Sequence, residues 1–334
     1  MHQIIRHSFH VILLCGLLVG CSADDGDDSP PPQSGVGTPI TNPDDGTTSP
    51  VTYYESVGCS GTSVYVLAHQ HDWQLFMNPK AYKDIQAATC TTAFIFLSAG
   101  DAGHGVTDDY YKARNNATIS VTRVVYDHAN KAGPWTPSTS PVITPSGEIA
   151  HHQYEGTHSY FFSLPDGGES GEGFQETGSA SLKKLYEGDS ITPIDNPAIK
   201  YTWSELVFTL HEIVAMLPTG GPLYINSFDT SLRNATDHPD RYYAGKAAED
   251  LVNGYFPDAG YRVFLGSGAG TLQRNLAVSE AELKKLVYAW TVGSVAGSGY
   301  PVVWNSSHLD KTYSCIAQAA TPAPINSINE PHCP

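Results

Sequence analysis

The chain has 334 residues, 40% of them hydrophobic, and a formal net charge of −16. This length and composition are ordinary for a globular protein with a sizeable core, in one large domain or two small ones. The acidic balance argues against nucleic acid or an anionic membrane surface as the main partner, because both attract a basic face.

The first residues have the pattern of an export signal. Arg6 precedes the apolar run VILLCGLLVG (residues 11–20), which is too short to span a bilayer as a helix. Its end, followed by Cys21, resembles the bacterial lipobox, in which cleavage before the cysteine leaves a thiol for lipid attachment. An ordinary secretory signal with an incidental cysteine is the alternative. We predict a signal peptide over residues 1–20 and a lipid anchor on Cys21, with Ser22 favouring the outer membrane.

Residues 22–50 consist mainly of Pro, Gly, Ser, Thr and Asp, with almost no large apolar side chain. Such a segment buries too little surface to offset the entropy lost on ordering. We therefore predict a disordered acidic tether over residues 21–50 and a folded domain over residues 51–334.

Four further cysteines fall in the predicted domain: Cys59, Cys90, Cys315 and Cys333. An exported domain favours disulfides, and four cysteines allow three pairings. We favour Cys59 with Cys90, because each lies just before a predicted strand, and Cys315 with Cys333. The absence of a Cys-x-x-Cys pair argues against a thiolate zinc site.

The domain alternates between strand and helix patterns. Residues 63–69 and 92–100 are near-continuous apolar runs typical of strands buried on both faces, and residues 72–88 between them have helical spacing. The elements predicted next are a helix over 108–117, a strand over 118–126, a loop over 127–147, a strand within 149–164, a glycine-rich loop over 164–174, a helix over 203–217, a strand over 222–228, a helix over 240–252, a strand over 261–266 and a helix over 279–292. This alternation predicts an α/β fold with an open, mostly parallel sheet and helices on both faces.

Polar side chains follow three of the predicted strands. They are His69, His71 and Asp72 after the first strand, Asp101 and His104 after the second, and Asp229, Asp237, His238 and Asp240 after the strand over 222–228. The carboxyl ends of parallel strands meet at one edge of a sheet, where ligands bind. Imidazole and carboxylate groups are the ligands that zinc prefers in catalytic sites. Each group alone also fits a turn or a helix cap.

At this point the sequence resembles the LmbE/PIG-L family of zinc-dependent N-deacetylases, which act on N-acetylglucosamine-containing molecules. AHQHDWQLFM (residues 68–77) resembles the family's Ala-His-Pro-Asp-Asp-Glu motif, FIFLSAGDAGHG (residues 94–105) its second strand and turn, and DHPDRYYAG (residues 237–245) its His-Pro-Asp-His segment. The resemblance covers roughly residues 62–310. It implies a Rossmann-like three-layer α/β/α fold.

Position by position, the resemblance implies roles for individual residues. It places zinc ligands at His69 and Asp72, the general base at His71, and the histidine that stabilises the oxyanion or donates a proton at His238. The family's third zinc ligand falls on Arg241, which stays protonated and cannot bind a metal. Arg114 and Asp101 are candidates for substrate binding, as is Arg241.

With Arg241 at the position of the third ligand, two accounts of the site remain open. In one, His69, Asp72 and a substituted histidine still hold zinc, and a remaining imidazole handles protons. In the other, the guanidinium of Arg241 takes the place of the metal beside Asp72 and leaves a site that binds glycans without hydrolysis.

The predicted function is that of a zinc-dependent N-deacetylase with an N-acylated amino-sugar substrate at the cell surface. The alternative is an inactive family member that binds glycans. A dinucleotide-binding protein is disfavoured because no Gly-x-Gly-x-x-Gly follows the first predicted strand. We expect no nucleic-acid partner.

Overall fold

The computed structural model describes residues 58–130, 138–218, 220–231, 234, 237–300 and 306–319, together with two short strands before them. The strands β1 (Ile40–Thr41) and β2 (Thr48–Ser49) pair antiparallel within the segment predicted as a tether. The predicted signal peptide, Cys21 and most of the tether lie outside the described residues. Among the described residues, no helix combines the length and the apolar character needed to cross a membrane.

The predicted α/β fold is confirmed by a nine-stranded mixed sheet, whose main path has the order β11-β10-β9-β3-β4-β8-β7-β5, with β6 paired to β7. The five strands from β10 to β8 run parallel, and antiparallel strands extend both sides. The strands are β3 (Gly61–Leu67), β4 (Cys90–Ser98), β5 (Ser138–Thr139), β6 (Val142–Thr144), β7 (Gly147–Tyr154), β8 (Thr157–Leu164), β9 (Leu223–Phe228), β10 (Gly260–Phe264) and β11 (Ser314–Gln318).

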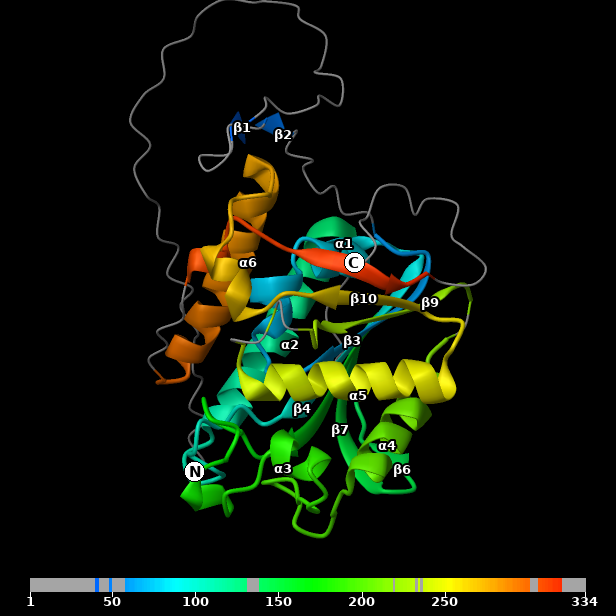
Figure 1. Cartoon of the computed structure of the whole chain (residues 1–334), viewed down its shortest axis with the longest axis vertical. Helices are drawn as coiled ribbons and strands as arrows, with labels where there is room; N and C mark the ends of the chain where they lie inside the picture. Colours follow the sequence, from blue (N-terminus) through cyan, green and yellow to red (C-terminus); the bar gives the residue numbers. More distant parts are fainter. Residues whose placement is uncertain are drawn as a thin grey trace, which may run out of the picture.

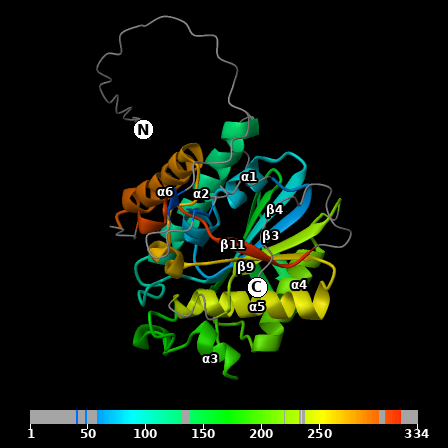
Figure 2. The same cartoon turned by 45° about the horizontal axis from the view of Figure 1, so that its top comes forward.

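Helices cover both faces of the sheet, as Figures 1 and 2 show, with α1, α2 and α6 on one side and α3, α4 and α5 on the other. The α-helices are α1 (Lys80–Gln86), α2 (Tyr110–Asn130), α3 (Leu182–Tyr186), α4 (Trp203–Ala215), α5 (Pro239–Tyr255) and α6 (Val278–Gly297). Short helical turns are η1 (Trp73–Met77), η2 (Gln175–Thr177), η4 (Ser267–Thr271) and η5 (Ser306–His308).

The central strands are apolar throughout because they have a core on each side. In β3, Val64 and Val66 pack in the layer of α3, α4 and α5, while Tyr65 and Leu67 pack in the layer of α1, α2 and α6. Successive side chains of a strand point to opposite faces, so a strand covered on both faces needs an unbroken apolar run. The strands β3 and β4 are parallel neighbours, as the strand–helix–strand pattern predicts.

The prediction of a strand over residues 118–126 was wrong, because these residues form the second half of α2. Ala117, Val121 and Val125 recur every four residues and are all buried, which is the spacing of one helix face. The branched residues of this segment favour a strand locally, but burial of this stripe against the sheet outweighs that preference.

Other boundaries also differ from the prediction. The strand predicted within 149–164 is the antiparallel hairpin of β7 and β8, whose turn holds Glu155 at a positive φ of 51°. The loop predicted over 127–147 contains β5 and β6, and β11 was not predicted. The helix predicted over 72–88 divides before Pro79, where Asn78 is extended, since a residue before proline disfavours the helical conformation.

The predicted Cys59–Cys90 disulfide is present, with 5.2 Å between the two Cα atoms. It joins the N-terminal ends of β3 and β4, where Gly61 pairs with Cys90. The predicted partner of Cys315, Cys333, lies outside the described residues.

Candidate functional site

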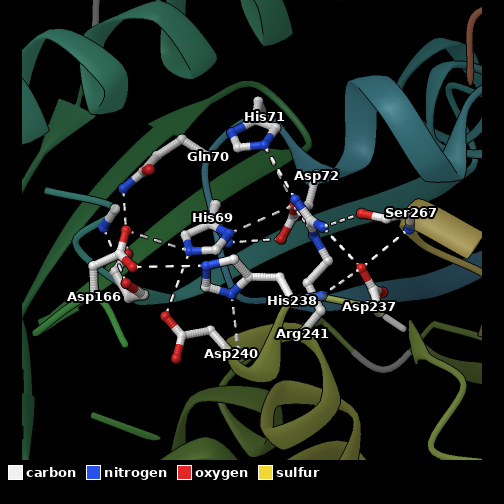
Figure 3. A network of polar contacts seen from close by, with 12 residues as sticks. His69, Gln70, His71, Asp72, Asp166, Asp237, His238, Asp240, Arg241 and Ser267 are labelled. Carbon is white, nitrogen blue, oxygen red and sulfur yellow. Dashed lines mark hydrogen bonds and ion pairs between the residues drawn. The ribbon is translucent and has the colours of Figure 1, made fainter. Parts of the chain in front are cut away.

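The chain brings the end of β3 and the beginning of α5 together at the carboxyl edge of the sheet. The rings of His69 and His238 lie 4.7 Å apart between centroids, edge to face at 87° (Figure 3). His69 follows an apolar strand, and His238 occupies the N-cap of α5, with Pro239 at the first helical position. Since His69 follows β3 and His238 comes after β9, the parallel neighbour of β3, the sheet brings the two residues to one point.

Asp72 is fully buried and forms an ion pair with Arg241 (Figure 3). Its Oδ1 accepts a hydrogen bond from Nε of Arg241 at 2.8 Å, and its Oδ2 accepts one from the backbone N–H of His69 at 2.7 Å. Both carboxylate oxygens are therefore engaged by the protein. The structure thus has a guanidinium beside Asp72 where the family resemblance implies a third ligand, and metal binding by His69 and Asp72 stays a prediction.

The guanidinium of Arg241 is held from several sides. Nη1 donates to Oδ1 of Asp237 at 2.9 Å and to Oγ of Ser267 at 3.0 Å, and the group lies 4.5 Å from the ring centroid of Phe76. Burial by itself would lower the pKa of Arg241, but the carboxylates of Asp72 and Asp237 outweigh burial and raise this pKa above its usual value. Arg241 is a permanent, fixed cation in this site.

His71 lies between two guanidinium groups. Its Nδ1 is 2.5 Å from Nη2 of Arg114, and its Nε2 is 3.4 Å from Nη2 of Arg241. Burial and the two nearby positive charges lower the pKa of His71 well below its usual value, so the ring is neutral at pH 7. A guanidinium only donates hydrogen bonds and a neutral imidazole accepts at one nitrogen, so the much shorter contact with Arg114 makes Nδ1 the acceptor and leaves the ring hydrogen on Nε2. The nitrogen that a general base would use is thus already engaged by Arg114, and the predicted role of His71 as the base stays a prediction.

Asp166, from the glycine-rich loop after β8, is a site residue that the sequence reasoning missed. Its Oδ2 lies 3.6 Å from Nε2 of His69, and its Oδ1 lies 3.9 Å from Nε2 of His238. The available signal was its position two residues after the apolar run that ends at Leu164. A single strand over residues 149–164 does not place Leu164 at the same sheet edge as His69. The hairpin does, because its second strand, β8, runs parallel to β4.

Asp101 supports the loop that carries Asp166. It is fully buried, and its Oδ1 accepts a hydrogen bond from the backbone N–H of Asp166 at 3.0 Å, while its Oδ2 accepts one from Gly105 at the same distance. Arg114 is also buried and donates to the carbonyl oxygen of Gly100 as well as contacting His71. These two predicted substrate-binding residues form part of the frame around the site. His104 instead lies at the exposed surface, paired with Asp108.

Asp240 is the second buried carboxylate beside His69. Its Oδ2 accepts a hydrogen bond from the backbone N–H of Gly167 at 2.9 Å and lies 3.5 Å from Nε2 of His69. A Cβ atom on residue 167 would come within 2.5 Å of Oδ1 of Asp240, so the close approach of this loop requires a glycine.

Several polar atoms at the centre of this cluster have no hydrogen-bond partner. They are both ring nitrogens of His69, which is 3% exposed, and Oδ1 of Asp240. Buried polar atoms nearly always have partners, so orphans in a cluster call for an explanation, such as a bound ion. Burial lowers the pKa of His69, but the surrounding carboxylates, Asp240 first, outweigh it and raise the pKa above its usual value.

The ligand atoms of His69, Asp166, His238 and Asp240 all lie within 4.8 Å of one another, close enough to hold a metal ion together. In a second grouping, His69, His71 and Asp72, the ligand atoms also lie within 4.8 Å of one another. There, however, Arg241 binds Asp72 and Arg114 contacts His71. In the part of the chain that the structure describes, no guanidinium forms an ion pair with Asp166 or Asp240, the carboxylates of the first grouping. Of the two, the grouping that includes Asp166 and Asp240 has the chemistry that a divalent ion requires.

Within the grouping of His69, Asp166, His238 and Asp240, the ring of His238 has a hydrogen-bond partner on the backbone. Its Nδ1 accepts a hydrogen bond from the backbone N–H of Asp240 at 3.2 Å. Burial, together with His69, lowers the pKa of His238 below its usual value, so the ring is neutral. The neutral ring therefore carries its hydrogen on Nε2, the nitrogen that faces Asp166, and the side chain is 13% exposed.

No protein-family model matches the chain, and no curated protein matches it. Among solved structures, it is similar to a deacetylase in the biosynthesis pathway of teicoplanin, with 13% identity over 70% of this chain and 84% of that one, at a TM-score of 0.40. It is also similar to the N,N'-diacetylchitobiose deacetylase from Pyrococcus horikoshii, with 13% identity over 72% of this chain and 71% of that one, at a TM-score of 0.38. The resemblance to the LmbE/PIG-L family stays a prediction from the sequence motifs.

Proposed function

We propose that this protein is a metal-dependent hydrolase that removes acyl groups from the nitrogen of amino sugars. The observation that carries the proposal is the buried imidazole of His69, unpartnered at both nitrogens and facing the carboxylates of Asp166 and Asp240. A group of this kind at the carboxyl edge of a parallel sheet is suited to hold a catalytic metal ion.

In the proposed reaction, water adds to the amide carbonyl carbon, the C–N bond breaks, and the amine leaves with a proton. A zinc ion in this grouping would lower the pKa of a bound water to about 7 and polarise the carbonyl oxygen. Among the chain's own residues, His238 supplies the hydrogen-bond donor. Its side chain is partly exposed, and the donor is its Nε2–H. It is placed to stabilise the developing oxyanion, because a neutral imidazole can donate this hydrogen bond while keeping its proton.

The substrate class comes from the sequence motifs and from the predicted export. An N-acylated glycan, such as one that contains N-acetylglucosamine, is available to a protein anchored at the outer face of a bacterial envelope through Cys21. Cell fractionation of a Cys21→Ser variant tests the anchor, because loss of the lipid should move the protein into the soluble fraction.

A second candidate function is glycan binding without hydrolysis, and one observation favours it. Arg241 neutralises Asp72, the residue that the family resemblance assigns as a ligand, and His71 has its accepting nitrogen engaged by Arg114. The site would then keep the shape of a hydrolase but not its chemistry.

The two candidates differ in acyl release. Purified full-length chain supplied with Zn²⁺ should release free acetate from N-acetylglucosamine oligosaccharides, and His238→Ala should lower kcat by about 10²- to 10³-fold, as expected for loss of one oxyanion donor. His128→Ala, at an exposed position of α2, is the control and should leave the rate unchanged. Binding of these oligosaccharides in calorimetry without acetate release would reject hydrolysis and establish the second candidate.

A further inference from the structure

The distances around His69 are too long for hydrogen bonds but match the spacing of ligands around one cation. Nε2 of His69 lies 3.5 Å from Oδ2 of Asp240 and 3.6 Å from Oδ2 of Asp166. Hydrogen bonds between nitrogen and a carboxylate are about 2.7–3.2 Å long. Two ligands held tetrahedrally by one Zn²⁺, each at about 2.1 Å, are separated by about 3.4 Å. Each carboxylate oxygen is therefore spaced from Nε2 of His69 as a second ligand of a shared ion would be, and the ligand atoms of the grouping all lie within 4.8 Å of one another.

The charges around His69 also favour a bound cation. Asp240 is fully buried and Asp166 nearly so, and no lysine or arginine among the described residues forms an ion pair with either carboxylate. Backbone N–H groups of Gly167 and Gly168 each bind one oxygen, which does not neutralise two charges. Two buried carboxylates that both face the imidazole of His69, with no described lysine or arginine paired to either, are costly, and a divalent ion offsets that cost.

His69 is oriented so that its other nitrogen faces Asp72. Nδ1 of His69 lies 3.9 Å from Oδ1 of Asp72, and Asp72 is held in turn by Arg241 and by the backbone of His69. Metal-binding histidines commonly present the second ring N–H to a carboxylate, which orients the ring and makes it a better ligand. At 3.9 Å the contact is one of charge and not a hydrogen bond, and through it Asp72 is placed to act on the metal site by way of His69.

His238 does not fit as a ligand, because its Nδ1 accepts a backbone hydrogen bond and its Nε2 carries the hydrogen. Without it, three protein ligands remain. Three ligands and one open position are typical of a catalytic metal site.

We infer that a divalent transition-metal ion binds between His69, Asp166 and Asp240, and that Asp72, paired with Arg241, supports this site from outside. The inference deepens the proposed function and rests on it for the use of the metal in a reaction. It moves the ion away from the His69–Asp72 pair predicted from the sequence, toward the loop after β8 and the first turn of α5. The residues that distinguish the two placements are Asp166 and Asp240 on one side and Asp72 on the other.

Metal binding to the full chain tests the inference without any substrate. Protein stripped with a chelator and titrated with Zn²⁺ should bind about one ion per chain by calorimetry and elemental analysis. Asp166→Asn and Asp240→Asn should each weaken binding by about 10³-fold or more, whereas Asp72→Asn, acting through His69, should weaken it by about 10- to 100-fold. Asp108→Asn, at an exposed position, should bind as the parent does.

A second measurement uses the unaltered chain, in case a variant fails to fold. X-ray absorption of the zinc-loaded protein should show one imidazole and otherwise oxygen ligands. Two imidazoles, an affinity of the parent chain no higher than that of a denatured control, or abolition of binding by Asp72→Asn with retention in Asp166→Asn, would each overturn the inference. Zinc bound in the expected pattern with no acetate release would reject the proposed hydrolysis and leave the metal site established.

Discussion

At the scale of single residues, Arg241 decides the chemistry of the site. The family resemblance implies a zinc ligand at this position, and the chain instead has a guanidinium that contacts Asp72, Asp237 and Ser267. This cation binds the carboxylate that a metal would otherwise share. A replacement of one side chain therefore changes both the charge and the hydrogen-bond pattern of the whole strand end.

We expect Arg241→Ala to lower the free energy of unfolding by about 3–5 kcal/mol, because it leaves Asp72 and Asp237 buried without their cation. Arg274→Ala is the matched control. Arg274 pairs with Asp310 but is 83% exposed, so its loss should cost less than about 1 kcal/mol. Chemical unfolding of both variants measures the difference, and equal effects would show that the buried pair contributes no more than a surface pair.

At the scale of elements, the hairpin of β7 and β8 carries two neighbouring histidines, of which His158 is buried and His151 is partly buried. Nε2 of His151 lies 3.1 Å from Nδ1 of His158, and the ring of His151 stacks on Tyr160 with 4.4 Å between centroids. Burial, with a smaller contribution from His151, lowers the pKa of His158 to about 4. The hairpin is therefore built around neutral imidazoles.

This pKa makes the stability of the domain depend on pH. Between pH 6.5 and 4 the unfolded chain binds a proton at His158 that the folded chain does not, so stability is complete above pH 6.5 and is lost as the pH falls toward 4. The loss should approach about 3 kcal/mol, since each pKa unit corresponds to about 1.4 kcal/mol. His158→Gln should flatten the dependence of the unfolding free energy on pH in this range. His128→Gln, at an exposed position, should retain the slope of the parent; an unchanged slope in His158→Gln would contradict the assignment.

Some helices and strands can be predicted from local sequence patterns alone, and others cannot. The strands β3, β4, β9 and β10 and the helices α4 and α5 were predicted close to their positions, because apolar runs and helical spacing report burial directly. The prediction of a strand for part of α2 was wrong, since a segment rich in Val, Thr and Ile locally favours a strand. Only its packing against the sheet selects the helix.

At the scale of the whole molecule, the disulfide and the candidate site lie at opposite edges of the sheet. The Cys59–Cys90 disulfide closes the N-terminal ends of β3 and β4, whereas His69 and the other site residues lie beyond the carboxyl ends of the strands. Both cysteines are buried, and the backbone N–H of Cys59 donates to Asp84 at 2.8 Å. The disulfide therefore holds the two central strands together at the edge opposite the site.

Replacing both cysteines by serine should lower the free energy of unfolding by about 3–4 kcal/mol, as expected for a bridge between residues 31 apart in sequence. Zinc affinity at native temperature should stay within about threefold of the parent value, because the site is at the opposite edge. Guanidinium unfolding gives the first quantity and calorimetry the second. A large drop in zinc affinity in the folded variant would show that the two edges are coupled.

The sequence by itself determined the α/β architecture and the presence of His69 and His238 after strands, because these depend on local apolar patterns and on the polar residues that terminate them. It favoured Cys59–Cys90 among three possible pairings, and the structure decided in favour of that pairing. Only the tertiary structure decided that Asp166 joins the site and that Arg241 pairs with Asp72, 169 residues away in the chain. The physical reason is that the ends of β3, β8 and β9 become neighbours only when the strands are ordered within the sheet. That order depends on the packing of the whole domain, which no single segment encodes.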